Sequence, residues 1–467
     1  MVEGETPFED IDNQKLNFGH MKVWFTSGMG FFTDAYDLFI IGIVLILLTG
    51  PYAVSMHLNI LQASLLGTSA IAAAIFGQLT FGIIADRFGR KKVYGIEATI
   101  LALGAILSAV STGFVMLFLS RFFLGLGIGG DYPVSATIMS EYANTKDRGK
   151  LLSLVFANQG LGSVTAVAVG IISVVILPPE LAWRFMLLFG AIPALAVIYL
   201  RRKLPETPRY SLLVNKDKNT AAMAKKVVGG NETISTVETE KHSISEFFSN
   251  YWKLLFITSF TWFLMDIAYY GTGIYSGPIV SQIIVPSSLA MKVFYAGVPF
   301  LVGFFGYFSA VALIDKVGRK SLQIGGFIGM AVIYMFISYI MIVRGTKVTG
   351  FMIPAELAFI LYSLSFFFID VGPNTTTFIL PAELYPVHYR TTSHGISAAS
   401  GKAGAAISTL FLPAILLQIG LKEMLLMLGI LSILGAIISI GLPEPKNRSL
   451  ETVAGEKIKT KTTAENS

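Results

Sequence analysis

The sequence predicts an all-α membrane protein, with twelve transmembrane helices arranged as two pseudo-symmetric bundles of six. Of the 467 residues, 54% are hydrophobic and only 14% are charged, and the mean hydropathy is +0.67. A soluble domain needs more polar surface than this composition provides, so lipid is the solvent for most of the chain. Apolar runs of about 20 residues, enough to cross a bilayer, recur in both halves.

The expected spans are continuously apolar and carry embedded glycines. Strands of a membrane barrel instead alternate in polarity over about ten residues, so we expect helices. Several spans exceed the minimum length, which allows tilted or kinked helices. In chain order the expected spans cover residues 22–48, 61–85, 92–112, 114–141, 150–177, 181–203, 251–282, 291–314, 321–343, 353–384, 390–418 and 422–442.

Lysine and arginine concentrate in the loops on one side of these spans. The positive-inside rule makes this side cytoplasmic, and an even number of spans then puts both termini in the cytoplasm. The first twenty residues lack a basic region followed by an apolar one, so we expect the first span to be retained rather than cleaved.

One long polar segment divides the spans into two sets of six. We expect an N-terminal bundle with its tail over residues 1–203, a central cytoplasmic linker over 204–250, a C-terminal bundle over 251–442 and a cytoplasmic tail over 443–467. Repeats of six helices with a binding site near the midplane are a common plan of secondary transporters.

Composition and spacing exclude several kinds of site. The chain has no cysteine, which excludes disulfides and thiolate chemistry, and its five histidines show no metal-ligand spacing. No Ser/His/Asp set or cofactor loop lies at the membrane face, so we expect neither an enzyme nor a bound cofactor or metal. Basic residues are not interleaved with aromatic ones, so we expect no nucleic-acid partner.

The two halves repeat a charged pattern at the ends of corresponding spans. GQLTFGIIADRFGRKK closes the second span and GYFSAVALIDKVGRK closes the eighth. These loops resemble the signature of the major facilitator superfamily, and PETPRY with PAELYP resembles its sugar-porter-like branch. We expect the charged residues to form a cytoplasmic latch, with simple anchoring of helix ends as the alternative. The latch residues are Asp86, Arg90, Glu141, Arg148, Asp315, Arg319, Glu383 and Arg390.

Five further strings fall on the expected helices in a consistent order. They are GFFTDAYDLFIIGIV, GLGIGGDYPVSATIMSE, WFLMDIAYYG, GPNTTTF and HGISAASGK. Together they resemble the phosphate:proton symporter family of fungi and plants, with its prokaryotic relatives, within that superfamily. The resemblance implies import of inorganic phosphate coupled to protons, by alternating access between two rocking halves.

The same resemblance implies a phosphate site at the centre of the bundle and a proton route in the N-terminal half. The phosphate site would comprise Tyr132, Gln159, Trp262, Asp266, Tyr270, Asn374 and Lys402. The proton route would comprise Asp34, Glu97 and Asp131, with Arg121 as their partner.

These residue types suit the implied chemistry. Trp262, Asp266 and Tyr270 are spaced four apart, so they project from one face of a helix. Hydroxyl, indole and amide groups donate hydrogen bonds to phosphate oxygens, and Lys402 offsets the charge of an anion where screening is poor. A buried carboxyl such as that of Asp266 can carry a proton, because burial disfavours its charged form.

Two residues complicate this pattern. Arg121 lies ten residues before Asp131 on one helix, nearly three turns away, so we expect it to pair through a neighbouring helix or a water. Asp370 lies one turn before Asn374. The family that this sequence resembles has an uncharged residue at the position of Asp370. An added acid changes the proton number or the preferred charge state of the substrate, so Asp370 joins the candidates for proton coupling.

Two other functions stay open at this point. A transporter of a sugar or small organic anion would keep the fold and change the cargo, and a non-transporting phosphate sensor would use the same pocket to signal. The seventh span lacks a Gln-Gln pair, which disfavours a sugar, and the short linker and tail disfavour a sensor. We expect a monomeric, multi-pass protein of the plasma membrane, with phosphate, protons and the lipid bilayer as partners.

Overall fold

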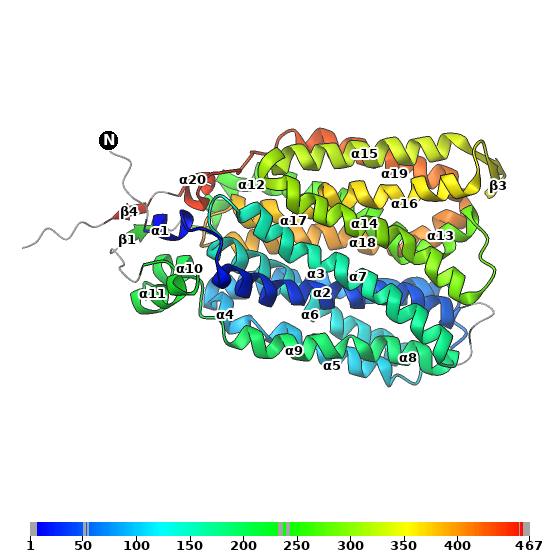
Figure 1. Cartoon of the computed structure of the whole chain (residues 1–467), viewed down its shortest axis with the longest axis horizontal. Helices are drawn as coiled ribbons and strands as arrows, with labels where there is room; N and C mark the ends of the chain where they lie inside the picture. Colours follow the sequence, from blue (N-terminus) through cyan, green and yellow to red (C-terminus); the bar gives the residue numbers. More distant parts are fainter. Residues whose placement is uncertain are drawn as a thin grey trace, which may run out of the picture.

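The computed structural model describes residues 7–49, 53, 56–231, 237–239, 243–456 and 458–460. Within these residues, twelve helical segments are long and apolar enough to cross a membrane, which confirms the predicted fold class. The segments run along the long axis of the molecule, with those of the first half on one side and those of the second half on the other (Figure 1).

The first half contains six spans, two of which are broken into a pair of helices. The third span breaks at Gly95, whose φ of 111° is easily reached only by glycine. The sixth breaks at Gly190, because Pro193 has no N–H to bond to the carbonyl four residues earlier. The helices are α2 (Phe18–Leu48), α3 (Ile60–Phe88), α4 (Arg90–Val93), α5 (Ile96–Ala109), α6 (Phe114–Tyr142), α7 (Arg148–Ile176), α8 (Pro179–Phe189) and α9 (Ala191–Arg202).

The second half also contains six spans. Its fourth span breaks at Gly372, because the next residue, Pro373, cannot donate to the carbonyl of Ile369. The break lies next to Asn374, a predicted ligand of phosphate. The helices are α12 (Ile244–Ile274), α13 (Ser276–Ile283), α14 (Leu289–Val317), α15 (Arg319–Ile340), α16 (Ala355–Val371), α17 (Pro373–Leu384), α18 (Arg390–Gln418) and α19 (Gly420–Ser439).

Two features of the second half differ from the expected boundaries. Helix α12 begins at Ile244, inside the segment expected to be a linker, because Ser243 and Glu246 form a capping box. The Ser243 Oγ accepts from the Glu246 N–H at 3.2 Å, and the Glu246 carboxylate accepts from the Ser243 N–H at 2.7 Å. A hairpin of β2 (Met341–Arg344) and β3 (Lys347–Phe351) follows α15, where no strand was predicted.

The first and last described elements lie at the same end of the bundle, which we call the terminal end (Figure 1). Short helices and a strand pair gather there, and the β2–β3 hairpin lies at the opposite end. An even number of spans requires this arrangement. The elements at the terminal end are α1 (Glu9–Asp12), α10 (Pro208–Leu213), α11 (Lys218–Val227), α20 (Leu450–Ala454), and the antiparallel strands β1 (Val237–Thr239) and β4 (Ile458–Thr460).

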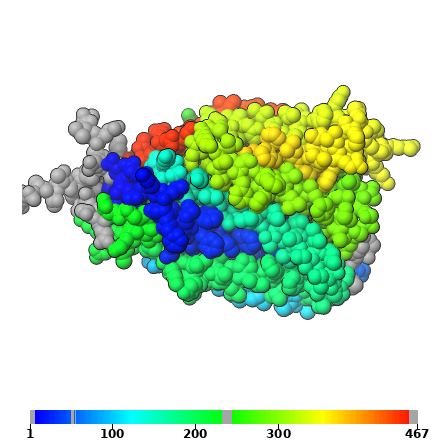
Figure 2. Space-filling view, in the orientation of Figure 1, coloured from blue at the N-terminus to red at the C-terminus, as the bar shows by residue number. Residues whose placement is uncertain are grey.

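The two halves meet along two pairs of helices. Helix α3 packs against α18, and α7 packs against α14. On the face shown in Figure 2, side chains of the first and second halves meet along a continuous seam. The centre of the molecule is therefore enclosed by helices from both halves.

Glycines bring α3 and α6 of the first half into direct backbone contact. A Cβ atom at Gly125 would collide with the backbone of Ala70, and one at Gly129 would collide with the carbonyl of Ala74. Small residues are how helices approach closely in a membrane, where apolar side chains gain little by leaving lipid. The glycine-rich run of α6 is thus a packing surface.

We predict that Gly125→Leu destabilises the protein by at least about 1–3 kcal/mol, the usual cost of overpacking, because the blocking atoms belong to backbone. Thermal unfolding in detergent measures the loss. Gly113→Leu is the matched control, since a Cβ at Gly113 meets no atom within 4 Å. Equal melting temperatures for the two variants would contradict the close packing of α3 and α6.

Candidate functional site

The seven residues of the predicted phosphate site come from five helices of both halves. Tyr132 lies on α6, Gln159 on α7, Asn374 on α17 and Lys402 on α18, and α12 contributes the other three. None of the seven is more than 2% exposed. Side-chain contacts link five of them directly, and Asn374 joins them through Tyr307 and Tyr269, so the structure brings together residues as far apart in sequence as Tyr132 and Lys402.

Lys402 is the charged centre of this group. Its ammonium donates to Asp266 Oδ2 at 3.0 Å and to the Tyr270 hydroxyl at 3.1 Å. The same ammonium lies 4.7 Å from the ring centroid of Tyr132 and 4.2 Å from that of Tyr270. Such cation–π contacts and a paired carboxylate stabilise a buried ammonium that would otherwise be costly. The other oxygen of Asp266 makes no hydrogen bond among the described residues.

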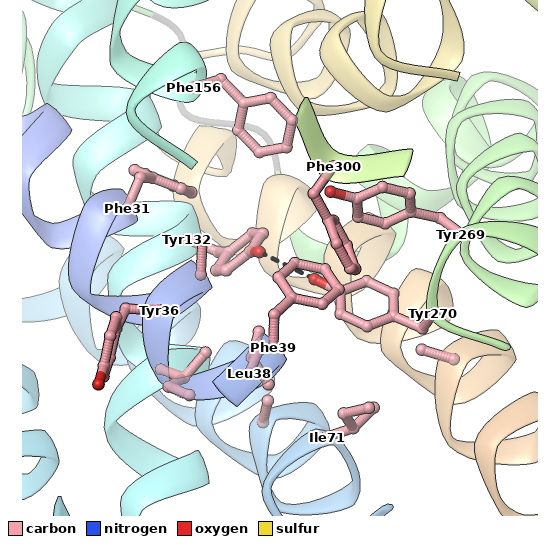
Figure 3. Close-up of a cluster of buried hydrophobic side chains, with 14 of the residues drawn as sticks. Phe31, Tyr36, Leu38, Phe39, Ile71, Tyr132, Phe156, Tyr269, Tyr270 and Phe300 are labelled. Atoms are coloured by element: carbon pink, nitrogen blue, oxygen red, sulfur yellow. Dashed lines mark hydrogen bonds between the residues drawn. The ribbon is translucent and has the colours of Figure 1, made fainter. Parts of the chain in front are cut away.

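Trp262, Asp266 and Tyr270 project from one face of α12, as their spacing predicted. Gly401 of α18 lets the indole of Trp262 lie directly against that helix, because a Cβ there would overlap the ring. The hydroxyls of Tyr132 and Tyr270 face each other across the two halves at 3.4 Å (Figure 3). Indole, ammonium and phenol donors therefore converge from both halves.

Asn374 and Gln159 lie on the other side of the group. The Asn374 amide donates to the hydroxyl of Tyr307 at 2.7 Å and to Asp370 Oδ1 at 2.7 Å. Tyr307 in turn is 3.1 Å from the hydroxyl of Tyr269. The Gln159 amide faces Tyr269 but makes no hydrogen bond of standard geometry in the described chain. These two tyrosines connect the two amides.

Aromatic rings close the polar group off from both ends. Phe39 stacks on Tyr270 with 5.5 Å between centroids and contacts Phe300 at 4.7 Å, and these rings lie together in Figure 3. Phe156 stacks on Phe378 at 4.4 Å. Because first-half and second-half rings interdigitate in each layer, the site can open only if the halves move apart.

A second cluster, of charged residues, lies within the first half. Arg201 of α9 bonds to Glu97 at 2.7 Å and to Asp131 at 2.7 Å. Gly30 of α2 makes room for this cluster, because a Cβ there would overlap Asp131 and Arg201. Asp34 lines the same small cavity of about 10 Å³, which is the size needed by one water molecule. The predicted acids Asp34, Glu97 and Asp131 are thus neighbours.

The predicted role of Arg121 as partner of these acids is wrong in this structure. Its guanidinium lies 3.8 Å from the carboxylate of Asp37 and donates to the backbone carbonyl of the same residue. Asp131 lies nearly three turns further along α6, on a part of the helix that faces α9 instead. Arg121 does pair with a neighbouring helix, α2, but with a different acid.

Arg201 is the functional candidate that the sequence did not reveal. It stands in an Arg-Arg-Lys run at a span end, which is the usual signature of orientation rather than of a site. Arg201 is buried and Arg202 is exposed, because only Arg201 faces α5 and α6. To tell Arg201 from Arg202 by sequence, one would need to know which side of the helix faces the neighbouring spans.

The eight predicted latch residues form a network at the terminal end, and two of its ion pairs join the halves. Arg148 of the first half bonds to Glu383 of the second at 2.6 Å. Arg390 of the second half bonds to Glu141 of the first at 3.0 Å. Each acid also binds an arginine of its own half, with Arg90 3.3 Å from Glu141 and Arg319 2.9 Å from Glu383. The shared acids tie four arginines together.

The two aspartates complete the network symmetrically. Asp86 accepts from the backbone N–H of Thr392 at 2.6 Å, in the first turn of α18. Asp315 accepts from the backbone N–H of Lys150 at 2.7 Å, in the first turn of α7. A carboxylate at a helix N-terminus is favourable because it meets free N–H groups and the positive end of the helix dipole. The arrangement favours a latch over separate anchoring of helix ends.

Arg209, in the segment between the halves, extends the network to both ends of the chain. It bonds to Asp12 of α1 at 2.7 Å and to Glu451 of α20 at 2.7 Å. Burial disfavours the charged form of Glu451, but the Arg209 guanidinium outweighs burial and holds the pKa of that carboxyl below its usual range. Elements from the start, middle and end of the chain thus close the terminal end together.

A family model described as sugar (and other) transporter matches residues 23–456. The chain belongs to this transporter family. Membership confirms the resemblance to the major facilitator superfamily and the expectation that the protein is not an enzyme. Inorganic phosphate transporter 1-1 of Arabidopsis thaliana is 36% identical, covering 96% of this chain and 96% of that protein. Low affinity inorganic phosphate transporter 3 of Petunia hybrida is 37% identical, covering 96% and 94%.

Solved structures of a proton:xylose symporter have the same fold. The proton:xylose symporter XylE bound to 6-bromo-6-deoxy-D-glucose matches with a TM-score of 0.78 at 19% identity, over 93% of this chain and 98% of that one. The inward open conformation of XylE from E. coli matches with a TM-score of 0.64 at 17% identity, over 93% and 99%. At these identities the likeness concerns the fold alone.

We predict that Arg201→Gln destabilises the transporter by about 3–5 kcal/mol near neutral pH, the cost of leaving a buried charge unpaired. Without Arg201, the buried carboxyls of Glu97 and Asp131 would have either to stay charged with no cation or to take up protons. The loss should shrink as pH falls, since protonated acids need no counter-charge. Arg202→Gln is the matched control at the exposed neighbour. Equal unfolding curves for the two variants in detergent would contradict the pairing.

We predict that Glu383→Gln opens the terminal end, because it weakens the bonds of Glu383 to both Arg148 and Arg319. The chain has no cysteine, so spin labels can be attached at cysteines introduced for Lys91 and Lys316, which are exposed residues of opposite halves. Pulsed electron–electron double resonance measures the distance between the two labels, and it should show a larger share of long distances in the variant.

The control for this measurement is Glu180→Gln, which breaks an ion pair of 3.1 Å with Arg184 within the first half. That pair is partly exposed and does not join the halves. If both variants gave the distance distribution of the wild type, Glu383 would not hold the terminal end closed.

Proposed function

We propose that this protein imports inorganic phosphate together with protons by alternating access of its two halves. One combined observation carries the proposal. The chain is 36% identical, over nearly its whole length, to proteins named inorganic phosphate transporters, and it has a buried centre of hydrogen-bond donors around Lys402. Phosphate requires many donors and one compensating cation, and this centre supplies both.

In this proposal, the phosphate ligands are Tyr132, Gln159, Trp262, Asp266, Tyr270, Asn374 and Lys402. Lys402 and Asp266 form a neutral pair at 3.0 Å when no anion is present. Protonation of Asp266 would leave the ammonium of Lys402 uncompensated, so an anion such as dihydrogen phosphate becomes its partner. Loss of that proton restores the internal pair and favours release of the anion. Coupling thus arises from competition for one ammonium.

The charged cluster of Asp34, Glu97, Asp131 and Arg201 is the proposed proton route of the first half. An ionised carboxyl in this apolar setting depends on Arg201, so each acid in excess of that one cation favours its protonated form. A water-sized cavity beside Asp34 and Glu97 supports proton transfer between them. Arg121 with Asp37 lies outside this cluster and fixes α6 against α2.

The latch residues Asp86, Arg90, Glu141, Arg148, Asp315, Arg319, Glu383 and Arg390 are proposed to stabilise the states in which the terminal end is closed. We place this end, with both termini, in the cytoplasm, because the short basic loops lie there. The two bundles, residues 1–203 and 251–442, are the proposed rocking units, and the protein is proposed to act as a monomer in the plasma membrane.

A transporter of sugar or a small organic anion is the alternative within the same fold. The family includes sugar transporters, and XylE shares the architecture. A neutral sugar needs no buried ammonium, however, and a larger organic acid needs more than the single lysine at this centre. A non-transporting sensor would bind phosphate without accumulating it.

We predict uptake of radiolabelled phosphate by proteoliposomes with an acidic exterior, and its loss on addition of a protonophore. Asp266→Asn should abolish gradient-driven accumulation because the competing carboxylate is gone. Binding of phosphate without uptake by the wild type would favour the sensor, and uptake of a sugar or organic anion instead would favour the alternative cargo.

Lys402→Met should raise the KM for phosphate about 10- to 100-fold, as expected for loss of a charge-assisted hydrogen bond worth about 1.5–3 kcal/mol. Lys347→Met, at an exposed lysine of the β2–β3 hairpin, is the matched control. An unchanged KM in a folded Lys402→Met variant would remove Lys402 from the binding site.

A further inference from the structure

Asp370 is a membrane-buried acid that lacks a cation. It lies in the last turn of α16, just before the break at Gly372, and is only 1% exposed. Asp131 pairs with Arg201 and Asp266 pairs with Lys402. In the part of the chain that the structure describes, no lysine, arginine or histidine forms an ion pair with Asp370. An ionised carboxylate in such a position is expensive, so it favours its neutral form.

The groups that face Asp370 are uncharged in the part of the chain that the structure describes. The titratable side chains that face it are tyrosines, from α14, α12 and α15, and α13 presents no ionisable residue. Because residues 303 and 306 are glycines, α14 packs closely against the carboxyl group of Asp370 and leaves no room for a water shell. The facing tyrosines are Tyr307, Tyr269 and Tyr334.

Asp370 competes with the substrate for a predicted phosphate ligand. The Asn374 amide has two N–H groups, and both are used: one donates to Asp370 Oδ1 at 2.7 Å and the other to the Tyr307 hydroxyl at 2.7 Å. The broken helix fixes this geometry, since the Thr375 hydroxyl also donates to the Asp370 carbonyl at 2.6 Å. Asn374 therefore has no N–H left for an anion in this conformation.

We propose that Asp370 carries an exchangeable proton that controls whether Asn374 can bind phosphate. Ionised Asp370 repels the anion and holds the Asn374 amide through a charge-assisted hydrogen bond. Protonated Asp370 removes the repulsion and accepts a weaker, neutral bond, so an N–H of Asn374 turns to the phosphate oxygen. The inference rests on the proposed phosphate transport. It adds a second proton-dependent switch to the one at Asp266, and both switches lie in the second half.

The test measures the KM for phosphate against external pH in proteoliposomes. For the wild type the KM should rise as pH rises, by up to about tenfold per pH unit for one linked proton. Asp370→Asn, which mimics the neutral acid, should remove this proton's share of the rise, so the slope falls toward that set by Asp266 and by phosphate's own titration. Glu356→Gln is the matched control, because Glu356 is an exposed acid in the first turn of the same helix.

A second pair of variants separates a switch from a merely structural role. In an Asn374→Ala background, adding Asp370→Asn should lower the KM by less than it does in the wild type, because only the direct repulsion of the anion is then removed. Asp370→Ala, which removes the acceptor, should flatten the pH profile as Asp370→Asn does. A profile as steep as that of the wild type in either folded Asp370 variant overturns the inference.

Two other results have distinct meanings. Stimulation of wild-type uptake by Na⁺ at constant pH, lost in Asp370→Asn, would show that the carboxyl binds a metal cation and would overturn the proton assignment. Absence of phosphate transport by the wild type would instead overturn the proposed function, and the inference with it. A wild type that transports phosphate, together with a folded Asp370→Asn variant whose KM has the same pH dependence, overturns the inference alone.

Discussion

The structure depends on one electrostatic constraint: a charge inside the membrane needs a partner, because lipid provides neither solvation nor screening. Lys402 meets it with Asp266 and two tyrosine rings, and Arg201 meets it with Glu97 and Asp131. Each pair is stable only while both partners stay charged and close together. Any event that changes one partner, such as arrival of a proton or an anion, must rearrange the other, and transport exploits this dependence.

Because of the internal repeat, the two halves carry similar charged residues, but these residues have different uses. At the terminal end the symmetry is close, since Glu141 with Arg390 mirrors Glu383 with Arg148. In the membrane interior the symmetry is lost. The first half gathers Glu97 and Asp131 around Arg201, whereas the second half presents Lys402, and Asp370 has no cationic partner among the described residues. The proposed latch benefits from symmetry, but the proposed substrate site and proton route need different charges on the two sides.

Packing explains how these polar groups are held in an apolar bundle. Glycines allow α3 and α6 to touch through backbone, and Gly30 and Gly401 leave space for Arg201 and for the indole of Trp262. Aromatic rings then cover the central site. Phe39 stacks on Tyr270 on one side, and rings from both halves stack on each other on the opposite side. The site is consequently buried and closed, which strengthens every hydrogen bond and charge interaction inside it.

The sequence by itself determined the twelve spans, the two repeats, the latch residues and the α12 face of Trp262, Asp266 and Tyr270, because hydropathy and helical spacing are local properties. It did not determine partners. Arg121 and Arg201 are both arginines near span ends, yet only Arg201 reaches Glu97 and Asp131. Such pairing depends on the rotation and contact of helices distant in sequence, and only the tertiary structure decides which buried charges meet.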